Sequence, residues 1–138
     1  MINTQIKSLV FIDDDEINNF LIQTSLQKHG YDGEVRFFDL AADALDYLRQ
    51  IVEESRIPKP DFIFLDIKMP IMNGFEFLQA FKEKKLNTAL PSKIFMVSSS
   101  TNQKDRDESI RSGIVEAYIE KPLSIDTIEK IAEKHLKY

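Results

Sequence analysis

The chain contains no cysteine among its 138 residues, which excludes a disulfide scaffold, a thiolate metal site and a cysteine nucleophile. Its first residues lack the basic-then-apolar pattern of a signal peptide, and no apolar run approaches the roughly 20 residues that span a bilayer. There is no glycine-rich phosphate loop and no large cluster of Lys and Arg, which disfavours nucleotide and nucleic-acid binding. These absences predict a cytoplasmic protein without membrane or nucleic-acid partners.

The composition that remains is that of a compact globular domain. The net charge is −5 and 43% of the residues are hydrophobic, a fraction that argues against disorder. A chain of this length suits one domain and can bury a sizeable core without disulfides or structural metals. We therefore expect residues 1–138 to form a single domain.

Five short apolar segments are expected to be strands, and they lie at residues 9–12, 35–38, 62–65, 94–97 and 117–119. Most are continuous rather than alternating, which is typical of strands covered on both faces of a parallel sheet. Apolar residues at helical spacing lie between them, so that a strand followed by a helix occurs five times. This order predicts an α/β fold in which a doubly wound parallel sheet of five strands carries five helices.

The helices differ in how strongly the sequence predicts their packing. Asp39 and Ser124 are expected to be the N-caps of the second and last helices. In the first helix we expect Ile17, Leu21 and Ser25 to share the core-facing stripe. This leaves one or both of Phe20 and Ile22 exposed, either as a docking surface or as scattered surface hydrophobics. The fourth helix, at residues 102–112, has Ile110 as its only large apolar residue, so it is either a solvated helix or a movable element.

Polar residues follow each predicted strand, where parallel strands end at one edge of the sheet. Ligands bind at this edge, at the point where the strand order reverses. For the order 2-1-3-4-5, the reversal lies between the first and third strands, which brings Asp13, Asp14 and Asp66 together. The fourth and fifth strands add Ser98 and Lys121.

This set of side chains indicates phosphoryl chemistry. Three crowded carboxylates cannot all stay ionised cheaply without a cation, and Mg²⁺ prefers oxygen ligands. An Asp carboxylate can attack a phosphoryl group while a metal and Lys121 stabilise the charge that is transferred. Each residue alone has an ordinary explanation as a cap or turn residue, but the combination at the strand ends is far more specific.

Four blocks of sequence carry a resemblance to a known family, and they lie at residues 10–15, 64–74, 96–99 and 118–122. Their sequences are Val-Phe-Ile-Asp-Asp-Asp, Phe-Leu-Asp-Ile-Lys-Met-Pro with Asn73-Gly74, Met-Val-Ser-Ser and Tyr-Ile-Glu-Lys-Pro. In this order, the blocks resemble the receiver domain of two-component response regulators, the group that includes the chemotaxis regulator. The resemblance covers essentially the whole chain and implies a flavodoxin-like fold with no effector domain.

The resemblance implies a role for each residue of the site. Asp66 would be the phosphoacceptor, and Ser98 and Tyr118 the switch residues, with Ser98 and Lys121 contacting the phosphoryl group. The Mg²⁺ ligands would be Asp14 directly, Asp13 mainly through metal-bound water, Asp66, and the backbone carbonyl of Lys68.

The resemblance also implies the partners. A histidine kinase or histidine phosphotransfer protein would donate the phosphoryl group, and the surface formed by the fourth helix, fifth strand and fifth helix would contact a downstream protein. The protein would not be an enzyme beyond self-catalysed phosphotransfer and autodephosphorylation, and a weak homodimer stays open.

Two features depart from the commoner family pattern. Asp15 extends the acidic pair to a triplet, which leaves open which carboxylates meet the metal. One extra residue lies between Gly113 and Tyr118, where it could shift the turn before the fifth strand.

Two other functions remain as alternatives. The chain could be a pseudo-receiver that binds partners without phosphorylation. It could also be a phosphohydrolase that uses Asp13 as its nucleophile, although the late acidic motif and cap domain of such enzymes are not evident.

Overall fold

The computed structural model describes residues 5–100 and 102–136. The strands are β1 (Ser8–Ile12), β2 (Glu34–Phe38), β3 (Phe62–Leu65), β4 (Lys93–Ser98) and β5 (Val115–Glu120). The helices are α1 (Glu16–Lys28), α2 (Ala41–Glu53), α3 (Gly74–Glu83), α4 (Leu86–Ala89), α5 (Gln103–Arg111) and α6 (Ile125–His135). Every predicted strand lies within an observed one.

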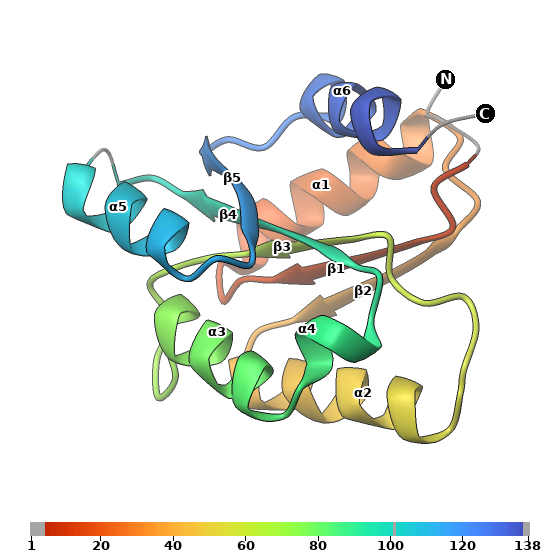
Figure 1. The fold of residues 1–138 in the computed structure, drawn as a ribbon. Coiled ribbons are helices and arrows are strands. Elements are labelled where there is room, and N and C mark those ends of the chain that lie inside the picture. The colour runs from red at the N-terminus through yellow and green to blue at the C-terminus, as the bar shows by residue number, and fades with distance from the viewer. Residues whose placement is uncertain (1–4, 101, 137–138) are drawn as a thin grey trace.

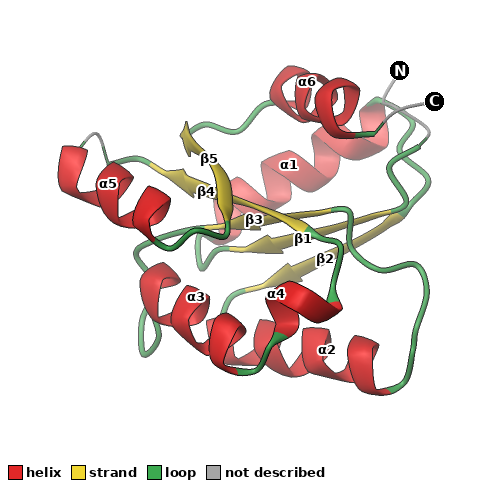
Figure 2. Cartoon of the chain, viewed as in Figure 1, coloured by secondary structure: helices red, strands yellow, loops and turns green. Residues whose placement is uncertain are grey.

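The five strands form one parallel sheet in the order β2-β1-β3-β4-β5, which confirms the predicted α/β architecture (Figure 1). Helices α1 and α6 cover one face of the sheet, and α2, α3 and α4 cover the other, as Figure 2 also shows. The described chain has six helices where five were expected. The additional helix, α4, is a single turn anchored by buried Leu86, and four residues are too few for an apolar period to reveal.

The core consists of two apolar layers, one on each face of the sheet. Alternate residues of β1 supply both, with Val10 and Ile12 in the layer under α2 and α3, and Leu9 and Phe11 in the layer under α1 and α6. Strands β1, β3 and β4 are buried on both faces, so the strand ends that carry the predicted site are fixed by the centre of the sheet.

Helix α1 packs through a different face from the predicted one. Its buried residues are Ile22 and Leu26, one turn apart, while Ile17 and Leu21 are exposed by 75% and 61%. Phe20 is exposed, as the prediction allowed. The apolar pattern was misleading because polar residues in the first turn of α1 face the sheet edge, and several of its apolar residues face solvent.

Two expected helix caps had different outcomes. Ser124 accepts a hydrogen bond from the backbone N–H of Thr127 at 3.2 Å and caps α6 as predicted. The prediction of Asp39 as a cap was wrong, because Leu40 occupies the N-cap of α2 and makes no side-chain capping bond.

The extra residue before Tyr118 is accommodated within β5 rather than in the turn before it. Ile94 pairs with Val115, but Phe95 pairs with Ala117, so Glu116 is a bulge in the edge strand. Beyond the bulge the register is regular as far as Ser98 and Glu120.

Helix α5 buries very little, as its sequence predicted. Ser109 is its only buried residue and Ile110 is 70% exposed. Apolar packing therefore contributes little to holding this helix against the rest of the domain.

Candidate functional site

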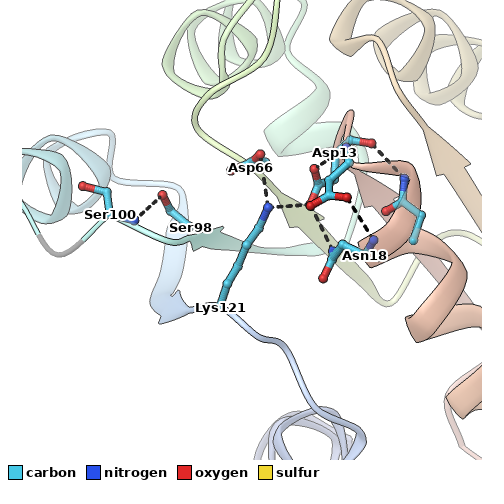
Figure 3. A network of polar contacts seen from close by, with 8 residues as sticks. Asp13, Asn18, Asp66, Ser98, Ser100 and Lys121 are labelled. Atoms are coloured by element: carbon cyan, nitrogen blue, oxygen red, sulfur yellow. Dashed lines mark hydrogen bonds and ion pairs between the residues drawn. The ribbon is translucent and has the colours of Figure 1, made fainter.

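The predicted polar residues meet at the carboxyl edge of the sheet, as expected. Asp13 follows β1, Asp66 follows β3, Ser98 ends β4 and Lys121 follows β5. In Figure 3 the side chains of Asp13, Asp66 and Lys121 point toward one another, with Ser98 farther along the same edge. Four segments that are distant in the sequence thus supply one site.

Lys121 joins the two buried carboxylates. Its ammonium nitrogen lies 2.8 Å from Asp13 Oδ2 and 3.3 Å from Asp66 Oδ2. Both Asp side chains are only 8% exposed. Low exposure limits screening by water, so these charges interact more strongly than a surface ion pair.

Burial and neighbouring charge shift the pKa values in this cluster. Desolvation, followed by repulsion from Asp13, raises the pKa of Asp66 to about 6, although Lys121 opposes the shift. Desolvation alone would lower the pKa of Lys121, but its hydrogen bond to Asp13 and the charges of Asp66 and Asp13 outweigh it, so that pKa is raised. The lysine is a cation, and the carboxylates hold more negative charge than one lysine balances.

The acidic cluster fits a hard divalent cation. One carboxylate oxygen each from Asp13, Asp14 and Asp66 lies within 4.8 Å of the others. Asp14 is exposed while the other two are buried, so the cluster opens to solvent on one side. Carboxylate oxygens are the ligands that Mg²⁺ prefers, and an open side leaves room for its waters.

Lys68 lies beside this open side. A cleft of about 400 Å³ is lined by both Asp14 and Lys68, together with residues of the loop that leads to α3. The loop that follows β3 therefore lies on the same open side of the cluster as Asp14.

The structure explains the third carboxylate of the triplet. Asp15 is the N-cap of α1 and accepts a hydrogen bond from the backbone N–H of Asn18 at 3.1 Å. Its own backbone N–H donates to Asp13 Oδ1 at 2.9 Å. Asp15 thus starts the helix and orients Asp13, while the carboxylate cluster itself consists of Asp13, Asp14 and Asp66.

Two residues that contact Asp13 were missed by the sequence prediction. Asn18 Nδ2 donates to Asp13 Oδ2 at 3.1 Å, and Asn19 Nδ2 donates to the Asp13 carbonyl at 2.9 Å. The available signal was a pair of amides in the first turn of a helix that begins immediately after the acidic triplet.

The predicted switch residues Ser98 and Tyr118 are connected through Ser100. Buried Ser98 accepts a hydrogen bond on Oγ from the Ser100 backbone N–H at 3.1 Å (Figure 3). The Tyr118 hydroxyl donates to the Ser100 carbonyl at 2.8 Å. Ser100 Oγ in turn donates to Asp105 of α5 at 2.8 Å. The end of β4, the ring on β5 and helix α5 therefore share one hydrogen-bond network.

A groove between α1 and α6 lies close to the acidic cluster. It has a volume of about 400 Å³ and includes Leu21, Ile22, Leu123 and Ile125 in its lining. Ile17 and Phe20 add further exposed apolar surface on α1. Apolar surface of this kind beside a polar site is typical of a protein-binding face.

Comparisons with known proteins identify the family of the chain. The chain matches the model of the response regulator receiver domain over residues 9–133. It is 28% identical over 130 residues to the polar-differentiation response regulator DivK of Brucella anthropi, covering 94% of this chain and 96% of DivK.

Solved structures give the same result. A two-component response regulator from Cytophaga hutchinsonii has 28% identity and a TM-score of 0.81, covering 95% of this chain and 97% of that one. The phosphorylated cyanobacterial phytochrome response regulator RcpA has 27% identity and a TM-score of 0.74, covering 95% and 94%.

Fold, site and comparisons define a two-component signalling module. The chain belongs to the response regulator receiver domain family. Among the described residues, no helix is long and apolar enough to cross a membrane.

Proposed function

We propose that this protein is a phosphoacceptor response regulator in which Asp66 takes a phosphoryl group from a histidine kinase or histidine phosphotransfer protein. The observation that carries the proposal is the convergence of the Asp13, Asp14 and Asp66 carboxylates within 4.8 Å. Lys121, bonded to Asp66, adds the positive charge that a transferred phosphoryl group requires. Membership of the receiver family supports the same chemistry.

In the proposed transfer, a carboxylate oxygen of Asp66 attacks phosphorus. The bond between phosphorus and the donor imidazole nitrogen breaks, and its electron pair returns to the imidazole. Lys121 then moves its ammonium from a carboxylate partner to a phosphoryl oxygen, where the new charge lies. The residues that would hold Mg²⁺ are Asp13, Asp14, Asp66 and Lys68, the last through its backbone carbonyl. When bound, the ion would neutralise part of the phosphoryl charge.

The proposed switch begins at Ser98. In the proposed switch, movement of its hydroxyl toward the phosphoryl group breaks the hydrogen bond from the Ser100 backbone N–H. Since Tyr118 is bonded to the carbonyl of the same residue, a shift of Ser100 changes the contacts of the ring as well. The surface formed by α5, β5 and α6 would then carry the signal to a downstream protein.

The proposed docking site for the phosphoryl donor is the exposed apolar surface of α1 with the α1–α6 groove. Ile17, Phe20 and Leu21 are exposed there, and the groove borders the peptide segment that follows Lys121. A donor helix bound at this place would bring its phosphohistidine to the carboxyl edge of the sheet.

The test is labelling with acetyl phosphate and Mg²⁺, followed by intact mass and peptide mapping. We expect one added phosphoryl group, located on Asp66 and lost in Asp66→Asn. Asp39→Asn is the matched control because Asp39 is exposed and follows β2 at the same sheet edge. An unlabelled wild type, or an undiminished signal in Asp66→Asn, would contradict the proposal.

The same experiment separates the alternatives. Label on Asp13 would favour the phosphohydrolase, in which Asp13 is the nucleophile. A folded wild type that accepts no label from either acetyl phosphate or phosphohistidine donors would favour a pseudo-receiver that acts without phosphorylation.

A further inference from the structure

Asp13 is held by donors from three directions. Its Oδ1 accepts the Asp15 backbone N–H at 2.9 Å, and its Oδ2 accepts Asn18 Nδ2 at 3.1 Å and Lys121 Nζ at 2.8 Å. Its backbone carbonyl accepts Asn19 Nδ2 at 2.9 Å. Figure 3 shows Asn18 and Lys121 converging on the same carboxylate. Only Lys121 among these donors carries a charge that competes with a bound cation.

The two asparagines owe their place to the start of α1. Asp15 caps the helix through the Asn18 backbone N–H, which fixes Asn18 and Asn19 in the first turn beside the end of β1. Asn18 thereby reaches the carboxylate of Asp13, while Asn19 reaches the backbone that carries it.

The side-chain oxygen of Asn19 has a different environment from its nitrogen. Its Oδ1 is buried and has no hydrogen-bond partner in the part of the chain that the structure describes. A buried carbonyl oxygen without a partner destabilises a fold. The same amide donates a hydrogen bond from its nitrogen to the Asp13 carbonyl, so its bonded end lies at the site.

We propose that Asn18 and Asn19 are positioning residues that orient Asp13 for divalent-cation binding, an inference that rests on the proposed function. The neutral amide of Asn18 restricts rotation of the carboxylate without cancelling its charge, and the amide of Asn19 holds the backbone that carries it. Without them, the Asp15 backbone N–H would still hold Oδ1, but Lys121 alone would hold Oδ2, and a cation would have to reorient the carboxylate as well as displace the lysine. Groups that orient a metal-binding residue typically change metal affinity by 10–100-fold when they are removed.

The test is calorimetric titration with Mg²⁺ of the wild type and Asn18→Leu, which removes the donor at similar volume. We expect the dissociation constant of Asn18→Leu to rise by about tenfold. Gln23→Leu is the matched control, since Gln23 is an exposed amide on the same helix, and its dissociation constant should equal that of the wild type. Asn18→Ser, whose side chain is too short to reach Asp13, replaces Asn18→Leu if that variant does not fold.

A double variant shows whether Asn18 acts through Asp13. In an Asp13→Asn background, Asn18→Leu should cause no further loss of Mg²⁺ affinity, whereas a general structural effect would lower affinity in both backgrounds. The metal-free unfolding midpoint of Asn18→Leu should be measured in parallel. Its change from the wild type should be too small to account for the loss of Mg²⁺ affinity.

The outcomes separate this inference from the proposed function. Equal Mg²⁺ affinity in Asn18→Leu and Gln23→Leu, or equal losses in both Asp13 backgrounds, would overturn the positioning role alone. Tenfold weaker binding in a protein whose Asp66 never becomes labelled would overturn the phosphoacceptor role alone. A wild type that binds no Mg²⁺ would overturn this inference together with the metal requirement of the proposed function.

Discussion

The guanidinium carbon of Arg106 lies 4.6 Å from the centre of the Tyr118 ring. The same guanidinium forms an ion pair with Glu120 at 3.0 Å, and the Tyr118 hydroxyl donates to the Ser100 carbonyl. Since α5 buries only Ser109, these polar contacts supply much of what attaches α5 to β5.

The first prediction concerns this cation–π contact. Arg106→Gln should lower the free energy of unfolding by about 1 kcal/mol, because it removes both the ring contact and the exposed ion pair. Urea unfolding gives the energy, and ring resonances of Tyr118 should report faster or wider motion. The control is Arg111→Gln, an exposed arginine at the other end of α5. Equal losses in the two variants would show that the ring contact contributes nothing.

The second prediction concerns charge crowding at the site. Without metal, Asp66→Asn should raise the free energy of unfolding by on the order of 1–3 kcal/mol at about pH 7.5. The pKa of Asp66 is raised to about 6 by burial and by Asp13, so its ionised form opposes folding, while Lys121 keeps Asp13 as a partner. Chemical unfolding of the wild type and the variant measures the difference. A less stable Asp66→Asn would mean that the pair with Lys121 outweighs the crowding.

The pH dependence of that difference follows from the raised pKa. In the wild type, the contribution of protonated Asp66 is fully present below its ordinary pKa of 3.8 and is lost as the pH rises through about 6. The advantage of Asp66→Asn should therefore shrink as the pH falls below about 6 and vanish near 3.8. Asp39→Asn, at an exposed carboxylate, should show no comparable gain at high pH.

The third prediction concerns the C-terminal end of α5. Lys82 Nζ donates to the Ser112 carbonyl at 2.6 Å, where the helix leaves its last carbonyls without partners. Lys82→Met should lower stability by only about 0.5 kcal/mol but should speed amide hydrogen exchange in α5 selectively. Lys84→Met, an exposed lysine at the end of the same α3 helix, is the control. Uniform acceleration across the sheet would contradict a local tether.

The fourth prediction concerns His135, whose ring contacts Phe95 and Phe62 with centroids 5.8 and 6.4 Å apart. Burial, followed by the positive charges of Lys93 and Lys134, lowers its pKa below the ordinary 6.5 although Glu116 opposes the shift. The unfolded chain therefore binds this proton more readily, so stability should decline as the pH falls below 6.5.

His135→Phe should remove that part of the pH dependence, measured by urea unfolding at several pH values. His29→Gln serves as the control, because His29 is exposed at the C-cap of α1. If the His135 ring resonance of the wild type gives a pKa above 6.5, the proposed effect of burial is contradicted.

The sequence predicted the centre of the fold well because burial there leaves few alternatives. Runs such as Phe62–Leu65 are continuous apolar segments that only a doubly covered strand accommodates. Once the strand order was assigned, the positions of Asp13, Asp66 and Lys121 followed from the rule that parallel strands end at one edge.

The rest depended on tertiary contacts that no local pattern records. The face of α1 that packs on the sheet is set by tertiary contacts. The apolar periodicity was misleading because Ile17 and Leu21 are exposed. Asn18 and Asn19 look like ordinary helix residues until the capped turn places them against Asp13. The bulge at Glu116 became evident only from the pairing of β5 with β4.

Because of that bulge, an extra residue in β5 does not shift the positions of the functional groups that follow it. Lys121 donates its backbone N–H to the Ser98 carbonyl at 2.9 Å. The register of the site end of β5 is therefore set by its pairing with β4 and not by its distance along the chain from α5. A residue gained or lost near Glu116 need not move Tyr118 or Lys121. A short reporter peptide inserted between α5 and the bulge would therefore leave the site end of β5 in register with β4.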